Sequence, residues 1–449
     1  MKRFFKRIRF YHHIIQAFWQ KRKKLIIFGF ACGVISFFIA YSLFNLRLKK
    51  VEKIGLVGKY TLNEIPLEIQ TLISDGLTTI DESGTPKPSL AASWEVKNEG
   101  KEYLFTLKDS LFWQDNKVVV ASDINIKFSD VAAVAIDQKT IKFMLKEPFS
   151  PFPIVVSRPV LKKGFLGTGE YKIEDIKRNG QTIERLILKP AKDKNKPQKI
   201  FRFYPTEETA RIGFKLGEVD FLEEIIRPED LLNWKKVNVS PEIKTNRFVA
   251  IFFNTNNPSL GEKSIRQGLA YAIKKDWPSR AINSFNPSSW AYNKEVKPYD
   301  YNLENAKRLL ENKNNDLGTN QNKQSLGEIE LATFSSLLPI AEQIKKDWEE
   351  IGITTKIKVI NSLYEDYQAL LATQEIPADP DQYLFWHSTQ ETNISHYKSP
   401  KIDILLEDGR KIFDQEKRKP IYQDFQRFLV EDSPAIFLFH PTVYNISRK

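Results

Sequence analysis

Cysteine and histidine are scarce in this chain of 449 residues, and their positions exclude several kinds of chemistry. The single cysteine, Cys32, can form neither an internal disulfide nor a paired thiol site for a metal or a redox reaction. Of the five histidines, His387 and His396 lie nine positions apart, which is no standard spacing for metal ligands. We therefore predict no metal site and no cofactor.

Motifs for catalysis are also missing from the sequence. It contains no H-E-x-x-H zinc motif, no G-x-S-x-G nucleophile turn and no Walker-type phosphate loop. Residues 55–61 resemble a phosphate loop only superficially, because their glycines have the wrong spacing. Carboxylates are numerous, but the sequence assigns no two of them as a general acid and a general base. The chain is predicted not to be an enzyme.

Positive charge is concentrated at the N-terminus. Residues 1–24 contain nine Lys or Arg and no acid, residues 25–46 contain no charge, and residues 47–449 hold 59 basic and 56 acidic residues. A nucleic-acid-binding domain needs its positive excess in the folded part, so no nucleic-acid partner is predicted. Hydrophobic residues make up 41% of the chain, which is enough for two or three packed cores.

The N-terminal region has the features of a membrane anchor. Residues 1–24 can form an interfacial helix on an anionic cytoplasmic leaflet or a disordered basic tail. The 22 uncharged residues Leu25–Leu46 can span a bilayer, and the nine preceding basic residues place the N-terminus inside. A cleaved signal peptide or a lipoprotein signal fits less well, because the run has no A-x-A-like exit and continues for fourteen residues past Cys32. We predict one uncleaved span in the cell membrane and an extracytoplasmic body.

The folded part alternates between strand and helix patterns. The apolar run Phe248–Phe253 predicts a buried strand, and a helix with Ser264 as its N-cap follows. One face of that helix is apolar: Ile265, Leu269, Ala272 and Ile273. Further helices are predicted from Glu207 to a cap at Gly217, at Leu303–Leu310, from Ile340 to Gly352, and around Ile402–Leu406 and Ile421–Leu429. A helix or a turn is predicted at Pro66–Ser74. Strands are predicted at Trp94–Val96, Tyr103–Leu107, Val118–Val120, Val219–Leu222, Glu328–Thr333, Ile353–Val359 and Ala435–Phe439. This order indicates an α/β fold.

Several of these segments occur in the same order in a known family. The pattern GL…P.LA.sW is matched by Gly76, Leu77, Pro88, Leu90, Ala91 and Trp94. The pattern Y.F.L…W.D…A.D is matched by Tyr103, Phe105, Leu107, Trp113, Asp115, Ala121 and Asp123. Later matches are Gly167–Tyr171, Arg247–Trp277, Asp379–Pro380–Asp381 and Pro434–Leu438. Over residues 56–445 the chain therefore resembles the family 5 extracellular solute-binding proteins, which capture peptides or nickel complexes for ABC importers.

Two departures from the family pattern are visible. Between Phe128 and Thr140 lie about a dozen residues where typical members have several tens, so the family's small second domain is expected to be trimmed. The chain also ends at Lys449, soon after the last matched strand, and we expect either a missing closing element or a truncated terminus.

The resemblance implies a two-lobed α/β fold of the type II, peptide-binding class of periplasmic binding proteins, preceded by one transmembrane helix. The implied parts are a cytoplasmic segment 1–24, an anchor 25–46, lobe I with a second-domain remnant 47–254, lobe II 255–430 and a return strand to lobe I 431–449. The implied function is that a monomer captures a peptide or another small solute by lobe closure and presents it to an ABC permease. The alternatives left open are a tethered peptide sensor or chaperone without an importer, and a metal or metal-chelate receptor.

The candidate ligand site is the stretch from Asp379 to Tyr397. It combines flat aromatic side chains with hydrogen-bonding groups, which suits a pocket for a polar solute. Its candidate contacts are Asp379, Tyr383, Trp386, His387, Gln390 and Asn393, together with Trp290, Tyr292 and Asn254 outside the stretch. The alternative is that Tyr383 and Trp386 belong to the core of a lobe.

One position of this stretch departs from the peptide-binding relatives. In those relatives an Asp shortly before the Asp-Pro pair binds the α-ammonium of the peptide. The corresponding residue here is Ile376, so the resemblance leaves Glu375 or Asp379 as the replacement.

Overall fold

The computed structural model describes residues 19, 21–24, 27–38, 50–126, 128, 130–316, 328–363 and 366–449. Residues 27–38 are helical, and no helix in the described part of the chain is both long enough and apolar enough to cross a membrane. The rest of the predicted span, residues 25, 26 and 39–46, lies outside the described residues, as does the segment 1–18. The membrane anchor therefore stays a prediction.

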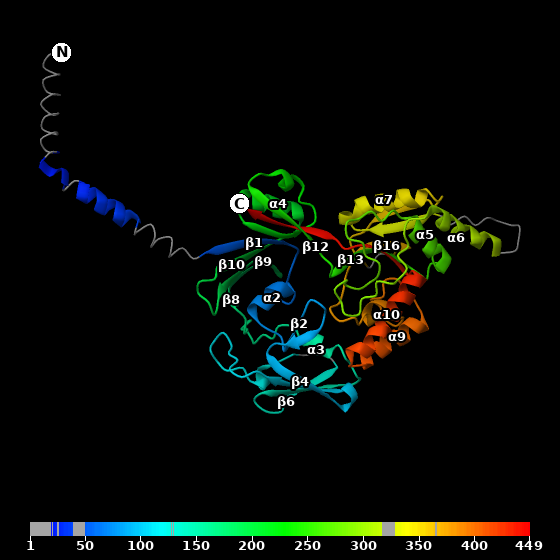
Figure 1. The fold of residues 1–449 in the computed structure, drawn as a ribbon, viewed down its shortest axis with the longest axis horizontal. Helices are drawn as coiled ribbons and strands as arrows, with labels where there is room; N and C mark the ends of the chain where they lie inside the picture. The colour runs from blue at the N-terminus through cyan, green and yellow to red at the C-terminus, as the bar shows by residue number, and fades with distance from the viewer. Residues whose placement is uncertain are drawn as a thin grey trace, which may run out of the picture.

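Lobe I is built on a seven-stranded sheet, which lies near the middle of Figure 1, around the labels β1, β9, β10 and β12. Its strands in spatial order are β12 (Val237–Ile243), β18 (Thr442–Arg448), β11 (Phe221–Ile225), β1 (Val51–Val57), β10 (Gln198–Tyr204), β9 (Thr182–Pro190) and β8 (Tyr171–Asn179). Strand β1 is parallel to both β10 and β11, whereas the other neighbours are antiparallel. Two helices pack against this sheet, α2 (Leu67–Ile73) and α4 (Glu207–Leu216).

Helix α4 has the two ends that the sequence predicts. The Thr206 hydroxyl accepts a hydrogen bond from the Thr209 amide at 3.2 Å, which satisfies one free N–H of the first turn. Gly217 ends the helix with φ of +80°, a left-handed conformation that glycine adopts without strain. The predicted helix from Glu207 to Gly217 is therefore confirmed.

A second, four-stranded sheet completes lobe I, below the first in Figure 1. It consists of β4 (Ala91–Lys97), β5 (Glu102–Leu107), β7 (Thr140–Leu145) and β6 (Val131–Ala135), next to the hairpin of β2 (Thr78–Ile80) and β3 (Pro86–Pro88) and helix α3 (Phe152–Val155). The short segment before Thr140 forms the edge strand β6. The predicted strand Val118–Val120 is wrong, because a tight turn from Trp113 to Lys117 leaves only an isolated bridge between Phe112 and Val118.

Lobe II is built on a five-stranded sheet. Its spatial order is β15 (Thr355–Val359), β14 (Ile329–Thr333), β16 (Ala369–Glu375), β13 (Arg247–Phe253) and β17 (Ala435–Phe439). Every residue of β13 from Phe248 to Phe253 is buried, which explains a continuous apolar run in place of an alternating one. The helices of lobe II are α5 (Lys263–Ala272), α6 (Leu303–Asp316), α7 (Leu338–Glu349), α8 (Tyr383–Trp386), α9 (Pro400–Lys411) and α10 (Gln415–Asp432). Short 3₁₀ turns occupy Asn98–Gly100, Ala121–Asp123, Glu229–Asn233 and Ser335–Leu337.

Helix α5 has the predicted buried stripe. The four residues of the stripe are fully buried: Ile265, Leu269, Ala272 and Ile273. The predicted N-cap is wrong, because the helix begins one residue before Ser264 and Glu262 occupies the cap position. The Glu262 side chain makes no capping hydrogen bond, so burial of the stripe, and not a cap, is what holds this helix in place.

The chain crosses between the lobes twice, once on each side of lobe II. The first crossing is Lys244–Asn246, between β12 and β13, and the second is His440–Pro441, between β17 and β18. The expected boundaries at residues 254 and 431 are therefore wrong. Both β13 and β17 pair inside the lobe II sheet, so lobe II runs from residue 247 to residue 439 and only β18 returns to lobe I.

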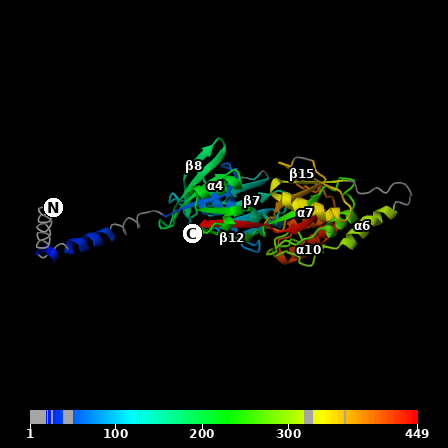
Figure 2. The same cartoon turned by 90° about the horizontal axis from the view of Figure 1, so that it is seen from above.

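The two lobes touch on the side away from the crossings as well. The Trp290 amide donates to the Ser83 carbonyl at 3.2 Å, and the Ser150 amide donates to the Arg410 carbonyl at 2.7 Å. A Cβ atom added to Gly84 would lie 2.3 Å from the Ala378 carbonyl oxygen, so only glycine fits this contact. Figure 2 shows the two lobes side by side along the long axis of the molecule. The described arrangement is one in which the lobes are in contact.

Candidate functional site

A cavity of about 740 Å³ lies between the lobes, beside the first chain crossing. Lobe I contributes residues of β1, α2, β10 and β11, and the crossing and lobe II contribute Asn246, Arg247, Glu375 and Ile376. A cavity of this size is in the range of small-molecule sites. Because its walls come from both lobes, a relative movement of the lobes would open or close it.

Two carboxylates that line the cavity already have partners. Glu207 accepts hydrogen bonds from the amides of Ile226 at 2.6 Å and Arg227 at 3.0 Å. Glu224 lies 2.8 Å from the Arg247 guanidinium and 2.9 Å from the Lys244 ammonium. Arg247 and Lys244 hold the pKa of Glu224 below its usual value, against the opposing effect of burial. These groups therefore tie β11 to the first crossing.

Three other carboxylates line the cavity without a partner. Glu68 of α2, Glu223 of β11 and Glu375 of β16 have neither an ion pair nor a side-chain hydrogen bond to any described residue. Burial raises the pKa of Glu223; the positive charges of Lys199 and Lys244 oppose this rise, and the neighbouring Glu224 and Glu68 add to it. Burial also raises the pKa of Tyr60, with Glu224, Glu68 and Glu375 contributing. The carboxylates and the phenol therefore share one space that offers negative charge to a ligand.

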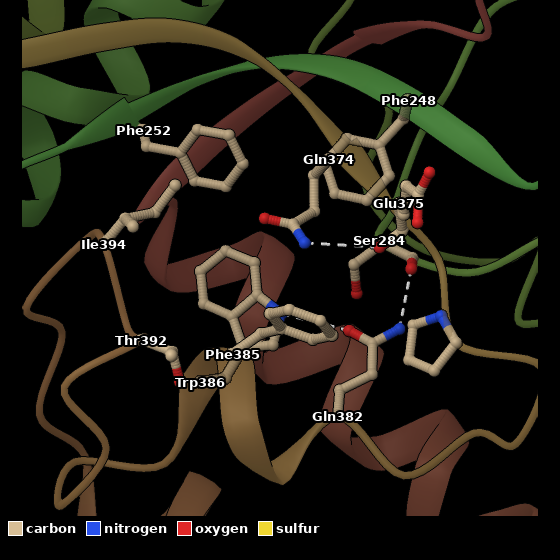
Figure 3. A pocket seen from close by; sticks show the side chains of 11 residues that line it. Phe248, Phe252, Ser284, Gln374, Glu375, Gln382, Phe385, Trp386, Thr392 and Ile394 are labelled. Atoms are coloured by element: carbon tan, nitrogen blue, oxygen red, sulfur yellow. Dashed lines mark hydrogen bonds between the residues drawn. The ribbon is translucent and has the colours of Figure 1, made fainter. Parts of the chain in front are cut away.

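A smaller aromatic pocket adjoins this cavity on the lobe II side. Figure 3 shows its lining side chains, which come from β13, β16, α8 and the loops around them: Phe248, Phe252, Ser284, Gln374, Glu375, Pro377, Gln382, Phe385, Trp386, Thr392 and Ile394. The Gln382 amide links two of them, donating to the Ser284 carbonyl at 2.6 Å and accepting from the Trp386 indole at 3.0 Å. Glu375 lines both the pocket and the cavity, so the two are neighbours.

The hydroxyl of Ser284 is unusual in this pocket. The residue is 1% exposed, and among the described residues its Oγ has no hydrogen-bond partner. A buried hydroxyl without a partner costs free energy, so Ser284 marks a point where a polar group or a water molecule would be stabilised.

Of the predicted site residues, only Trp386 lies in this pocket, where it is 3% exposed and its ring is 6.1 Å from that of Phe252. Tyr383 faces a different groove, between the four-stranded sheet and α9. There its ring stacks on His387 at 4.0 Å and lies 4.2 Å from the Arg410 guanidinium carbon. Trp386 belongs to the apolar core of lobe II, and Tyr383 packs against it.

The polar residues of the predicted stretch bond to one another. His387 Nδ1 lies 2.8 Å from the Thr389 hydroxyl, and the Gln390 amide donates to the same hydroxyl at 3.0 Å. Asn393 is 2% exposed and donates to the Tyr397 carbonyl at 2.9 Å. None of the three lines the cavity or the aromatic pocket. Their hydrogen bonds hold the loop in shape.

The remaining candidates are also engaged by the protein. Asn254 donates to the Tyr367 carbonyl at 3.2 Å, and Asp379 pairs with Arg418 at 2.8 Å. Trp290 lies with its ring 5.4 Å from the Arg418 guanidinium carbon, and Tyr292 is half-buried, which raises the pKa of its phenol. None of the four lines the cavity. Asp379 is therefore paired within the protein, whereas Glu375 lines the cavity.

Sequence reasoning missed the lobe I half of the cavity. Its residues come from five separate segments between residues 54 and 226, and each segment alone is typical of an ordinary strand or helix with its flanking turn. Their common signal is only that acidic residues, Glu68, Glu223 and Glu224, occur beside apolar positions of these elements. Without the sheet order, nothing in the sequence joins them.

Comparison with known proteins identifies the family. The family model described as bacterial extracellular solute-binding proteins, family 5 Middle, matches residues 125–395. The chain belongs to this family. Among curated relatives, the probable D,D-dipeptide-binding periplasmic protein of Escherichia coli K12 is 24% identical, with 78% of each chain covered. The dipeptide-binding protein of the same organism is 23% identical, with 81% of this chain and 82% of the relative covered.

Solved structures show the same fold. The structure of NikZ from Campylobacter jejuni in complex with Ni(L-His) covers 89% of this chain and 94% of its own, with a TM-score of 0.73 and 24% identity. The oligopeptide-binding protein AppA of Bacillus subtilis, in complex with a nonapeptide, covers 89% and 95%, with a TM-score of 0.69 and 18% identity. The predicted two-lobed α/β fold is therefore confirmed. The family assignment and the names of these relatives, which are binding proteins, support the prediction that the chain is not an enzyme.

Proposed function

We propose that this family 5 solute-binding protein is the receptor of an ABC importer and captures short peptides in the cavity between its lobes. The observation that carries the proposal is Glu375, an unpaired carboxylate shared by the cavity and the aromatic pocket. Glu375 stands next to Ile376, the position at which the peptide-binding relatives have their ammonium-binding aspartate. We assign it the role of binding the α-ammonium of the peptide.

The neighbours of Glu375 support this assignment. In the β13–β16 ladder Glu375 is opposite Arg247, whose guanidinium is directed to Glu224 instead. The negative charge of Glu375 is therefore not cancelled within the protein. Glu375 is exposed at the end of its strand, and an ammonium beside it forms a charge-assisted hydrogen bond with the carboxylate.

Closure of the lobes is the proposed mode of action. The two short crossings act as hinges, and a ligand that touches both lobes favours the closed arrangement by its differential affinity for it. The closed receptor would then be presented to a permease in the membrane. We propose further that residues 25–46 anchor a monomer to the cell membrane with residues 1–24 in the cytoplasm and the body outside.

Calorimetry with the full chain in detergent tests the role of Glu375. We expect tri-alanine to bind, and N-acetyl tri-alanine to bind about 10- to 100-fold more weakly, because acetylation removes a charged hydrogen bond of about 1.5–3 kcal/mol. Glu375→Gln should remove the difference between the two peptides. Glu208→Gln, an equal change of charge on α4 that does not line the cavity, should preserve it.

Other outcomes point to the alternatives. The similar structure in complex with Ni(L-His) makes a metal chelate the second candidate ligand. Among the described residues, however, no three or more His, Cys, Asp or Glu side chains are grouped so that they could hold a metal ion. Binding of nickel–histidine but of no peptide of two to five residues would therefore replace the peptide proposal. Binding of neither would favour a sensor or chaperone with a protein partner.

A further inference from the structure

We infer that the cavity selects peptides with a basic side chain, which lies against lobe I between Glu68 and Glu223. The inference rests on the proposed function and adds the chemical class of the ligand. It follows from the charges that line the cavity. Five carboxylates, Glu68, Glu207, Glu223, Glu224 and Glu375, face two cations, Lys199 and Arg247.

Neither cation of the cavity is free to balance a ligand carboxylate. Lys199 lies 2.5 Å from Glu52, and Arg247 lies 2.8 Å from Glu224. An acidic side chain in the cavity would therefore have to displace an internal ion pair and would meet unpaired carboxylates. This arrangement excludes acidic peptides and favours cationic ones.

The unpaired carboxylates lie on both lobes. Glu375 belongs to lobe II, whereas Glu68 of α2 and Glu223 of β11 belong to lobe I. A peptide whose α-ammonium binds Glu375 leaves both lobe I carboxylates without an ion pair to any described residue. A second positive group on the same peptide would bridge the lobes, and the closed arrangement would gain both interactions.

The walls of the cavity on the lobe I side suit a long basic side chain. Apolar residues surround the two carboxylates: Ile54, Leu56, Leu67, Ile69, Leu72 and Phe201. Lysine and arginine lay their aliphatic stems on such a surface while the charged tip reaches a polar group. The ring of Tyr60, which also lines the cavity, adds a face on which a cation can lie. The cavity therefore has an apolar wall for the stem of a basic side chain and carboxylates for its charge.

The test compares tripeptides that differ only in side-chain charge, by calorimetry on the full chain. We expect at least one of Lys-Ala-Ala, Ala-Lys-Ala and Ala-Ala-Lys to bind at least tenfold more tightly than tri-alanine. The glutamate peptides of the same three patterns should bind more weakly than tri-alanine. Added salt should reduce the preference for lysine, because it screens charges that remain partly solvated.

Two variants locate the effect. The double variant Glu68→Gln and Glu223→Gln should lose the preference for lysine, so that the lysine peptides bind it no more tightly than tri-alanine does. Its melting temperature should not fall, since neither carboxylate has a partner to lose. The control Glu208→Gln should keep the preference.

The outcomes separate this inference from the proposed function. Equal affinity for the alanine, lysine and glutamate peptides would overturn the inference and leave the peptide receptor intact. A preference for lysine that survives in the double variant would overturn the assignment to Glu68 and Glu223. Binding of a free polyamine such as spermidine without binding of any peptide would overturn both.

Discussion

Asp379 and Arg418 form a two-point ion pair inside lobe II, with Nη2–Oδ1 and Nη1–Oδ2 distances of 2.8 and 3.2 Å. Both side chains are more than nine-tenths buried. Arg418 also donates to the Gly409 carbonyl at 2.9 Å and to the Tyr422 hydroxyl at 3.1 Å. The pair thus joins the loop before α8 to the helices α9 and α10. The Asp379 carboxylate, which the sequence predicts as a ligand contact, is therefore bound to Arg418.

Removing one member of this pair should destabilise lobe II strongly. In Arg418→Met the Asp379 carboxylate stays buried without a cation, which costs about 3–5 kcal/mol. Urea unfolding at pH 7 measures the loss. The matched control is Arg427→Met, which breaks the exposed pair of Arg427 and Asp424 on the same helix, at 2.8 Å. It should cost less than about 1 kcal/mol, and equal losses would contradict a special role for the buried pair.

Gly84 tests the contact between the lobes. Its φ of +84° and its closeness to the Ala378 carbonyl both require glycine. We expect Gly84→Ala to push the lobes apart and to weaken peptide binding by roughly 1–3 kcal/mol, the usual size of local backbone strain. Small-angle scattering should show a larger radius of gyration.

A second glycine supplies the control for this experiment. Gly180 has φ of +61° and no atom within 4 Å of an added Cβ. Gly180→Ala therefore introduces a similar backbone strain without a contact across the lobes. It should lower stability but leave ligand affinity and the radius of gyration unchanged, and a similar drop in affinity would show that strain alone explains the effect.

Ser284→Ala should leave stability unchanged or raise it by up to about 1 kcal/mol. The substitution removes a buried hydroxyl that has no partner among the described residues, so nothing is lost and a desolvation cost disappears. The contrasting variant is Ser395→Ala, whose equally buried hydroxyl donates to the Asn393 side chain at 2.8 Å. That variant should lose about 1 kcal/mol or more. A comparable loss in Ser284→Ala would reveal a bound water or another partner.

His440 at the second crossing should make stability depend on pH. It is 3% exposed and donates through Nδ1 to the Arg247 carbonyl at 2.9 Å. Burial lowers its pKa, so below pH 6.5 the unfolded chain takes up a proton before the folded chain does. The contribution of His440 to the free energy of unfolding is therefore complete above pH 6.5, and it falls by up to about 1.4 kcal/mol for each pH unit below that.

Thermal unfolding between pH 7 and 5 measures this contribution. His440→Gln should flatten the loss on acidification, since glutamine keeps a hydrogen-bond donor but does not titrate. The control His396→Gln, at an exposed position, should keep the slope of the unaltered protein. An unchanged slope in His440→Gln would show that other groups cause the acid sensitivity.

Local features of the fold were predictable wherever a few neighbouring residues determine the structure. Gly217 ends α4 because of its own backbone freedom, and the stripe that begins at Ile265 is buried because one helix face is apolar. The lobe boundaries were not predictable in this way. The sequence of strand β13 is apolar and would fit a buried position in either sheet. Only its pairing with β16 and β17 assigns it to lobe II.

The site was harder to predict, because the hydrogen-bond and ion-pair partners of a polar side chain can lie far from it in the sequence. Asp379 looks available until Arg418, 39 positions later, is placed next to it. Asn393 looks like a ligand contact until the carbonyl groups of its own loop surround it. Glu223 looks like an ordinary surface acid, and only the sheet order brings it into one cavity with Glu68.

The pairing of β12 with β18 has a consequence for how the protein can be altered. The two strands are hydrogen-bonded neighbours from Val237–Arg448 to Ile243–Thr442, where their ends face each other. In terms of connectivity, lobe II is a single uninterrupted insert in what would otherwise be a hairpin. Joining Ile243 to Thr442 through an Asn-Gly turn would close that hairpin without disturbing the strand order of lobe I. A replacement of lobe II as one unit would therefore alter the chain at only two neighbouring points, but it would also have to reproduce the contacts that lobe II makes with Ser83 and Ser150.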